Sequence, residues 1–94
     1  MAGFEWDPAK RESNLVKHGI DFVDAIAIFD GFVLRLRDPR GSYGEVRFVA
    51  IGQVGDQLLA VVCTPRPDAI RIISARRANR HETRAYRAVR PQEA

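Results

Sequence analysis

Residues 47–64 read RFVAIGQVGDQLLAVVCT, and they hold two apolar runs joined by a Gly-Asp pair. The runs at 47–54 and 57–64 have the length and the aliphatic content of buried strands. A two-residue loop that begins with glycine suits a tight hairpin turn, so Gly55 and Asp56 are expected to form one. The stretch therefore predicts a β-hairpin, and the other elements are expected to be arranged around it.

Capping and turn signals place the remaining elements. Three further strands are expected, at residues 4–6, 32–37 and 69–75, and turns are expected at residues 38–42 and 65–68. Three helices are expected, over residues 8–18, 22–29 and 80–89. Asp7 can cap the first helix and Gly19 can end it in the left-handed conformation, whereas Asn79 and Glu82 have capping-box spacing at the start of the last helix. This order predicts an α+β fold with helices packed on one face of a largely antiparallel sheet of about four to five strands.

The composition limits the class of protein. A chain of 94 residues with 46% apolar side chains can form one domain, over residues 1–94, with a single modest core. No apolar run is long enough to cross a bilayer, and the N-terminus shows no signal-peptide pattern. Cys63, the only cysteine, is expected to be a buried and inert thiol, and with His18 and His81 it offers too few ligands for structural zinc. No disulfide, metal or other cofactor is therefore expected. A cytoplasmic location is expected, because disulfides are rare in proteins of that compartment.

The charges are unevenly distributed. The net charge is only +3, but residues 61–94 carry eight basic and three acidic side chains. Thirteen of the fifteen cations are arginines, whose planar guanidinium matches phosphate and carboxylate groups better than a lysine does. This pattern favours a phosphate, a nucleic acid or an acidic protein as the partner. An arginine-rich genome is the alternative explanation.

Several arginines are candidate ligands for phosphate. Arg76 and Arg77 follow the predicted 69–75 strand and stand just before the last helix, where free backbone amides add to the attraction for an anion. The same helix carries a cationic edge formed by Arg80, Arg84 and Arg87. A solvated helix surface without a ligand is the alternative for that edge.

Two more arginines lie inside predicted strands. Alternation along a strand places Arg47 on one face with Val49, and Arg71 on one face with Ile73 and Ala75. Each can line the floor of a groove, or can extend along the apolar surface to place its charge at the edge of the sheet. The sequence leaves both alternatives open.

Groups that can move protons occur on two of the predicted helices. The first helix has a polar, cationic face formed by Lys10, Asn14 and Lys17. His18 stands beside that face at the end of the helix, where the helix dipole favours its protonated form. Tyr86 shares a face of the last helix with Glu82, and a half-buried core aromatic is the alternative role for it.

The chemistry available to these residues is restricted. The chain has no phosphate-loop or dinucleotide glycine pattern, no nucleophile elbow, no metalloprotease helix and no acidic cluster typical of a two-metal nuclease. Arginine, lysine, histidine and tyrosine suit RNA cleavage by the neighbouring 2′-hydroxyl, because the RNA then supplies its own nucleophile. The protein needs only to orient the phosphate, offset its developing charge and move protons.

The sequence resembles the BrnT toxin family over about residues 4 to 88. The matching blocks are Phe4-Glu5-Trp6-Asp7, Lys10, Asn14-Leu15, Lys17-His18-Gly19, Phe22, Arg47-Phe48, Ile51-Gly52 and Ile72-Ile73-Ser74-Ala75-Arg76-Arg77-Ala78. The resemblance implies a RelE-like fold and a type II toxin that cuts RNA and inhibits translation. It also implies a BrnA-like antitoxin with a ribbon-helix-helix part, a heterotetrameric complex, and contacts to operator DNA made only by the antitoxin.

A working mechanism combines the residues with this resemblance. The resemblance implies an active site lined by Arg76, Tyr86, Lys17 and His18. Arg76 and Arg47 are then expected to hold the scissile phosphate, Lys17 and His18 to handle one proton, and Tyr86 the other. The residues expected to bind RNA around this centre are Lys10, Asn14, Arg71, Arg77, Arg80 and Arg84.

Three other functions fit the same charges. The first is a non-enzymatic module that binds RNA or DNA through its basic face. The second is an interaction protein whose arginines dock an acidic partner. The third is an inactive family member that still binds its antitoxin.

Overall fold

The structure is a computed structural model that describes residues 3–40 and 45–90. Its elements, in chain order, are β1 (Gly3–Glu5), α1 (Pro8–His18), α2 (Phe22–Ala25), the 3₁₀ helix η1 (Ile26–Asp30), β2 (Leu34–Asp38), β3 (Arg47–Val54), β4 (Gln57–Pro65), β5 (Ala69–Arg77) and α3 (Arg80–Val89). The turn expected at residues 38–42 is described only as far as Arg40. No helix in the described part of the chain is long and apolar enough to span a membrane.

The first helix begins and ends where its sequence signals predict. The Asp7 side chain accepts a hydrogen bond from the Ala9 N–H at 2.9 Å, and Pro8 occupies the first turn, where no N–H is needed. Gly19 adopts the left-handed conformation with φ of 71° and donates its N–H to the Leu15 carbonyl.

The helix expected over residues 22–29 is two shorter pieces. Asp21 caps α2 by accepting the Val23 N–H, but from Ile26 the chain continues as the tighter η1. This turn presses Ile28 onto Gly52 of β3, where a built Cβ would lie 2.7 Å from the Ile28 Cβ. The missing side chain at Gly52 therefore lets η1 pack directly on the sheet.

The sheet has the strand order β1-β5-β4-β3-β2. The predicted hairpin is confirmed: Val54 pairs with Gln57, and Gly55 takes a positive φ of 60° in the two-residue turn. The pairings β2–β3, β3–β4 and β4–β5 are antiparallel, whereas β1 pairs with β5 in parallel, so the sheet is mixed.

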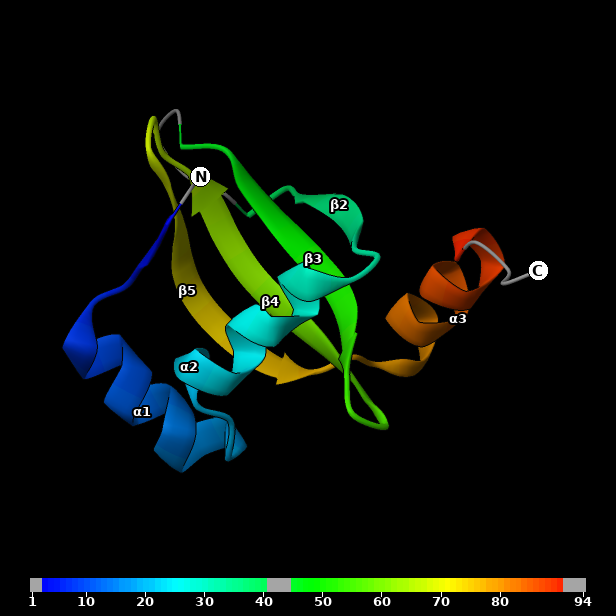
Figure 1. Ribbon diagram of the computed structural model, residues 1–94, viewed down its shortest axis with the longest axis horizontal. Helices are drawn as coiled ribbons and strands as arrows, with labels where there is room; N and C mark the ends of the chain where they lie inside the picture. Colours follow the sequence, from blue (N-terminus) through cyan, green and yellow to red (C-terminus); the bar gives the residue numbers. More distant parts are fainter. Residues whose placement is uncertain (1–2, 41–44, 91–94) are drawn as a thin grey trace.

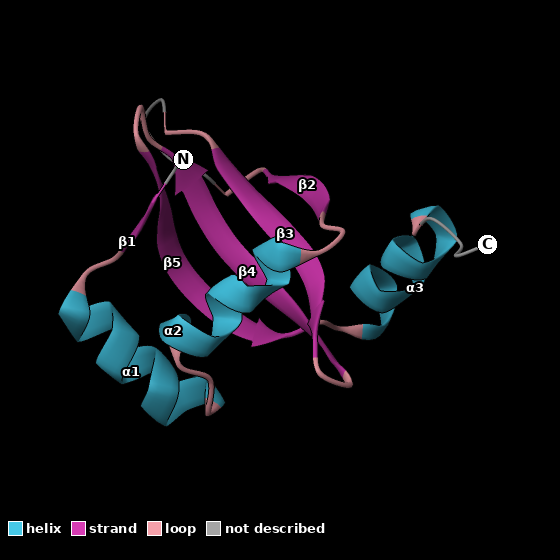
Figure 2. Cartoon of the chain, viewed as in Figure 1, coloured by secondary structure: helices cyan, strands magenta, loops and turns pink. Residues whose placement is uncertain are grey.

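Helices pack on both faces of this sheet, which corrects the expectation of one covered face. In Figures 1 and 2, α2 and η1 lie over one face, and α3 lies near one end of the sheet. One face, here called the α1–η1 face, packs the segment from Ile20 to Ile28 against strand residues such as Ala50 and Val61. The other, here called the α3 face, carries Val49, Ile51, Ala60 and Val62, and Tyr86 of α3 packs against it. The uninterrupted apolar runs in β3 and β4 explain this arrangement, because a strand buried on both faces needs apolar side chains at every position.

A register shift changes the orientation of β5. Cys63 pairs with Ile72 whereas Val62 pairs with Ser74, so Ile73 is an extra residue in β5. Ile73 therefore packs on the α3 face, while Ala75 belongs to the α1–η1 face. The expected common face for Ile73 and Ala75 was wrong, because simple alternation takes no account of a bulge.

Candidate functional site

Three charged residues share the α3 face beside the area that α3 covers. Arg47 alternates with Val49 and Ile51 along β3. Asp38 is the cross-strand partner of Arg47, and Arg76 is the partner of Ala60. Cross-strand partners lie on the same face, so Arg47, Asp38 and Arg76 all project from one side of the sheet.

Arg47 lies at the start of β3 within a group of ion pairs. Its Nε donates to Glu45 at 3.1 Å, and the other oxygen of Glu45 lies 3.5 Å from Arg66. The Arg47 side chain is partly exposed. Arg47 is therefore fixed at one end of the α3 face, with its positive charge accessible.

Asp38 is a buried carboxylate among arginines. It accepts hydrogen bonds from the backbone N–H and the Nε of Arg40, at 2.9 and 3.1 Å. These bonds, and more weakly the charge of Arg47, hold the pKa of Asp38 below its usual value. An ionised Asp38 with a lowered pKa is a weak base and is better suited to orienting cations than to accepting a proton.

Arg76 is the last-but-one residue of β5 and forms a bidentate ion pair with Glu82. Its Nη1 and Nη2 donate to the two carboxylate oxygens at 2.7 and 2.9 Å. These bonds are the main cause of the lowered pKa of Glu82, and they raise the pKa of Arg76, to which the nearby charge of Asp38 adds. The side chains are only 28% and 10% exposed, so water screens the pair less than it screens a surface ion pair.

Tyr86 lies on the same face but is buried. Its ring packs against Phe32 with a centroid separation of 5.5 Å, and its hydroxyl donates to the Phe32 carbonyl over a long 3.5 Å. Only 3% of Tyr86 is exposed. The tyrosine therefore anchors α3 to the sheet, on the face that also carries Arg47 and Arg76.

Asn14 belongs to the core and not to an exposed RNA surface. It is 5% exposed, and its Nδ2 donates to the carbonyls of Ile20 and Ala75, each at 2.9 Å. Its Oδ1 accepts the Ala75 N–H at 3.1 Å. The amide thus pairs with the edge of β5 as a neighbouring strand would, and leaves no polar atom free for RNA.

The other candidates on α1 lie on a helix that packs against β5, the strand that carries Arg76. Lys10 and Lys17 are exposed and His18 is half-buried. His18 follows Asn14 by four residues and therefore shares its side of α1, which packs along β5. The structure consequently places Lys17 and His18 at the β5 edge of the sheet, on a different element from Arg47 and Tyr86.

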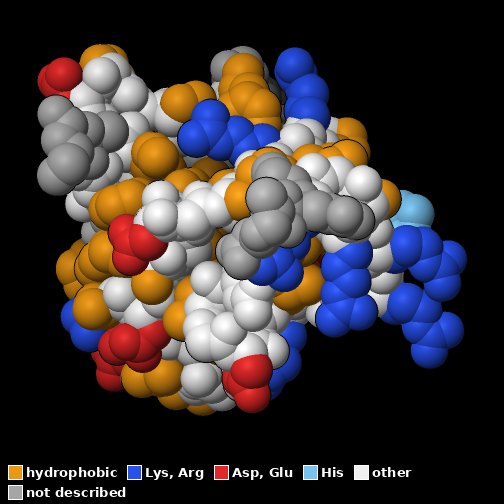
Figure 3. All heavy atoms as spheres, turned by 45° about the vertical axis from the view of Figure 1, so that its right-hand side comes forward, with side chains coloured by type: hydrophobic (Ala, Val, Ile, Leu, Met, Phe, Trp, Pro, Cys, Tyr) orange, Lys and Arg blue, Asp and Glu red, His pale blue; other side chains and the backbone are white. Residues whose placement is uncertain are grey.

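The remaining basic candidates divide into paired and exposed residues. Arg71 donates to Glu5 of β1 at 2.8 Å, which ties β5 to the edge strand. Arg77, Arg80 and Arg84 are exposed, and Arg80 and Arg84 line an open depression together with Ala78, Thr83 and Arg87. Figure 3 shows lysine and arginine side chains gathered on this side of the molecule, with acidic ones mostly on the opposite side.

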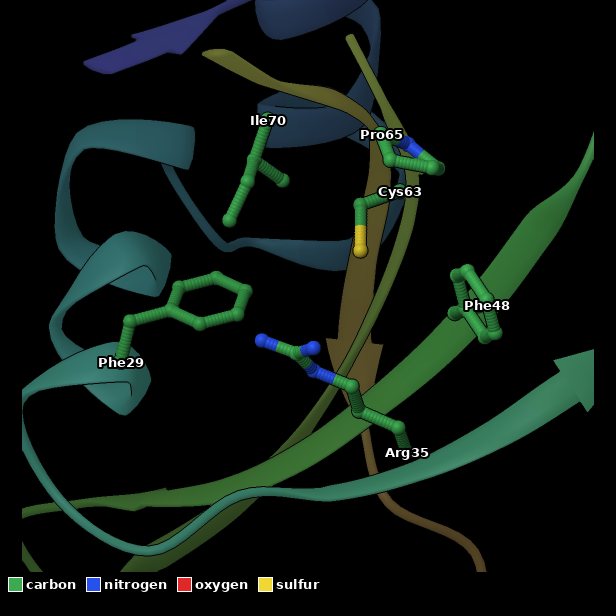
Figure 4. Close-up of a pocket in the computed structure, with 6 residues that line it drawn as sticks. All are labelled: Phe29, Arg35, Phe48, Cys63, Pro65 and Ile70. Carbon is green, nitrogen blue, oxygen red and sulfur yellow. The ribbon is translucent and has the colours of Figure 1, made fainter. Parts of the chain in front are cut away.

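A small apolar pocket lies on the α1–η1 face, between η1 and the sheet. Its volume is about 60 Å³, and it is lined by Phe29, Arg35, Phe48, Cys63, Pro65 and Ile70. Figure 4 shows the Arg35 guanidinium reaching between Phe29 and Cys63. Burial raises the pKa of the Cys63 thiol to about 11, so at neutral pH it is a protonated thiol and a poor nucleophile.

Among residues 3–40 and 45–90, no group of three or more histidine, cysteine, aspartate or glutamate side chains lies close enough to hold an ion. The charged groups that share the α3 face are instead Arg47, Asp38 and Arg76, and Asp38 interacts electrostatically with both arginines. Sequence reasoning missed Asp38, although its alternation with Leu34 and Leu36 places it on that face.

Comparison with known proteins identifies the family. A model of the BrnT family, described as the ribonuclease toxin of a type II toxin–antitoxin system, matches residues 6–82. The chain belongs to the BrnT family. The match covers most of the chain, including Arg47, Arg76 and Glu82, and it confirms the resemblance seen in the sequence.

The fold agrees with that of a solved BrnT structure. The crystal structure of the ribonuclease toxin BrnT of Brucella abortus superposes with a TM-score of 0.67 and 29% sequence identity. The alignment covers 85% of this chain and all of that one. A comparison with curated proteins gave no match. The α+β fold with a five-stranded mixed sheet is thus the BrnT fold, and membership of a type II system implies an antitoxin partner.

Proposed function

We propose that this BrnT-family chain is an endoribonuclease toxin that cuts RNA without a metal ion, inhibits translation and acts in the cytoplasm. The observation that carries the proposal is the pair Arg47 and Arg76 on one face of the sheet, each partly accessible and each oriented by a carboxylate. Two guanidinium groups on one face suit a phosphodiester whose negative charge grows in the transition state.

The proposed reaction uses the RNA as its own nucleophile. The 2′-oxygen loses its proton and attacks the adjacent phosphorus, while the bond from phosphorus to the 5′-oxygen breaks and that oxygen gains a proton. The products are a 2′,3′-cyclic phosphate and a 5′-hydroxyl end. Arg47 and Arg76 stabilise the charge on the non-bridging oxygens, and no oxidant, reductant or cofactor takes part.

The two protons are assigned to groups on different elements of the fold. Lys17 and His18 are proposed to serve one proton from the β5 edge, where α1 packs on β5. Tyr86 is proposed to serve the other, which requires its hydroxyl to leave the Phe32 carbonyl. Lys10, Arg71, Arg77, Arg80 and Arg84 are proposed to bind the RNA backbone around the centre.

The proposed antitoxin is BrnA-like, with a ribbon-helix-helix part that contacts operator DNA in a heterotetramer. The cationic side of the molecule around α3 supports an antitoxin with acidic side chains at the contact, because like charges would repel there. The same surface is then offered to RNA when the toxin is free and is covered by the antitoxin when the toxin is inhibited.

The proposal is tested with three matched arginine variants. Arg47→Ala and Arg76→Ala are expected to lower the RNA cleavage rate about 10²-fold each, because each removes a stabilising charge from the transition state. Arg37→Ala is the control, since Arg37 is exposed and pairs with Phe48, whose side chain packs on the α1–η1 face. Cleavage that is unchanged in the first two variants, with the fold intact, would contradict the assignment. Growth arrest on expression of the wild type, relieved by Arg76→Ala, tests the toxin activity.

A further inference from the structure

The guanidinium of Arg76 is held by one edge only. Its Nη1 and Nη2 each donate one proton to Glu82, and the second proton of Nη1 faces the Arg77 carbonyl over a long 3.4 Å. The Nε–H and the second proton of Nη2 have no acceptor among the described residues. These two N–H groups form a second fork, which matches two oxygens of a phosphate.

Glu82 is itself held rigidly. Its Oε1 also accepts the Asn79 N–H at 2.9 Å, while its own N–H donates to the Asn79 side chain at 2.8 Å. This capping box fixes the carboxylate in the first turn of α3, where the helix dipole favours a negative charge. Glu82 is 7% exposed, so its neighbours restrict it to one orientation.

The strand below Arg76 is fixed as well. The amide of Asn14 binds both the N–H and the carbonyl of Ala75, the residue before Arg76. Ala60 of β4 pairs with Arg76 on the other side. Both ends of the Arg76 side chain are therefore held, the backbone end by Asn14 and β4 and the charged end by Glu82.

We propose that Glu82 is a positioning residue, which grips Arg76 by one edge so that the edge formed by Nε and Nη2 is set to bind the scissile phosphate. The inference rests on the proposed function and deepens it by assigning a role to an acidic residue that touches no substrate. An arginine already ordered by a carboxylate loses little side-chain entropy when the phosphate binds.

The substitution Glu82→Gln separates the two roles of Glu82, because it is expected to keep the helix cap and to weaken the hold on Arg76. Glutamine keeps an oxygen for the Asn79 N–H, so α3 still begins with a capping box. It loses the second acceptor and the charge that hold Arg76. Glu12→Gln is the matched control, because Glu12 is an exposed glutamate on α1.

The kinetic test is a double-mutant cycle on RNA cleavage. Glu82→Gln is expected to lower kcat at least tenfold with helix content unchanged, and to have no further effect in the Arg76→Ala background. Glu12→Gln is expected to cleave at the wild-type rate. A Glu82→Gln variant that cleaves like the wild type, or that adds its full effect to that of Arg76→Ala, would overturn the proposal.

An NMR test keeps this inference separate from the proposed function. The NMR signal of the Arg76 Nε–H is assigned by its loss in Arg76→Lys. In the wild type this signal is expected to report an ordered guanidinium and to shift when inorganic phosphate is added. In Glu82→Gln the order and the phosphate shift are expected to disappear. If the wild type cuts no RNA but shows these two NMR results, the proposed function fails and the positioning role stands. If the signal behaves identically in both proteins, the positioning role fails.

Discussion

Replacement of Asn14 by alanine tests the most consequential contact that α1 makes with the sheet. The substitution removes three hydrogen bonds and leaves the Ala75 N–H and the carbonyls of Ala75 and Ile20 without partners in a buried place. A buried backbone group without a partner costs about 1–3 kcal/mol. We take the low end for each group, because α1 lies at the edge of the sheet where water can enter, and expect a loss of about 3 kcal/mol.

This loss is a large part of the stability of a small domain. Domains of this kind are stable by roughly 5–15 kcal/mol, so the Asn14→Ala variant is expected to remain folded but to be much weakened. For a chain of about this length 1 kcal/mol corresponds to roughly 4–8 °C in Tm, which gives a decrease of at least about 12 °C.

Urea unfolding followed by circular dichroism measures the effect. The urea concentration at the midpoint of unfolding is expected to be lower for Asn14→Ala, while the dependence of the unfolding free energy on urea concentration is unchanged. Ser13→Ala is the control, because Ser13 is the exposed neighbour on the same helix, and it is expected to change stability by less than about 0.5 kcal/mol. An Asn14→Ala midpoint equal to that of the wild type, with weaker RNA binding, would refute the buried role and restore Asn14 as an RNA contact.

Three further substitutions or treatments probe other parts of the account. Gly52→Ala is expected to destabilise the protein by about 1–3 kcal/mol in the same urea assay, because the new Cβ meets Ile28 at 2.7 Å; an unchanged midpoint would show that η1 does not pack so closely. Cys63 is expected to resist a thiol reagent at pH 8 until the chain is unfolded, because burial raises its pKa to about 11, and rapid labelling of the native protein would contradict this. Asp38→Asn is expected to be less stable than the wild type at neutral pH. The hydrogen bonds from Arg40 lower the pKa of Asp38 in the folded protein. The ionised Asp38 therefore stabilises the fold fully at pH values above the pKa that Asp38 has in the unfolded chain. This stabilisation is lost as the pH falls through the pKa of Asp38 in the folded protein, so the difference in stability between the wild type and Asp38→Asn should shrink there. A difference independent of pH would contradict the role of the ionised carboxylate.

Local signals in the sequence predicted local structure well. Asp7, Gly19 and the pair Asn79 and Glu82 mark helix ends because their effect depends only on neighbours three or four residues away. The hairpin turn at Gly55 was likewise predictable, because the positive φ there favours glycine.

Contacts between distant parts of the chain were not predictable in this way. The position of α3 on the second face depends on where Tyr86 finds an apolar surface. The uninterrupted apolar runs of β3 and β4 indicate burial on both faces of the sheet, and the sequence prediction of one covered face did not use this. Asn14 reads as a polar surface residue on α1, yet its amide pairs with Ala75, which lies 61 residues later in the chain. A common role for Arg47 and Arg76 was predicted from their charge and from the lack of metal ligands, but their shared face was not, because their strands are separated by β4.

The role of Glu82 shows how one residue can carry two signals. Its spacing from Asn79 predicted a capping box, which the structure confirms. The bidentate pair with Arg76 could not be read from the same spacing, because it depends on how β5 enters α3. A capping residue next to a candidate catalytic arginine is therefore worth examining for a second partner.

The most direct test of the central claim is cleavage of a defined RNA by the purified chain, freed of any antitoxin, in the presence of a chelator. The account predicts cuts that persist with the chelator, leave 2′,3′-cyclic phosphate and 5′-hydroxyl ends, and are lost in Arg76→Ala with its fold intact. Cleavage that requires an added divalent ion, or that leaves 5′-phosphate ends, would contradict the proposed 2′-hydroxyl mechanism. An absence of cleavage both on naked RNA and with translating ribosomes would contradict the assignment of this chain as an active ribonuclease.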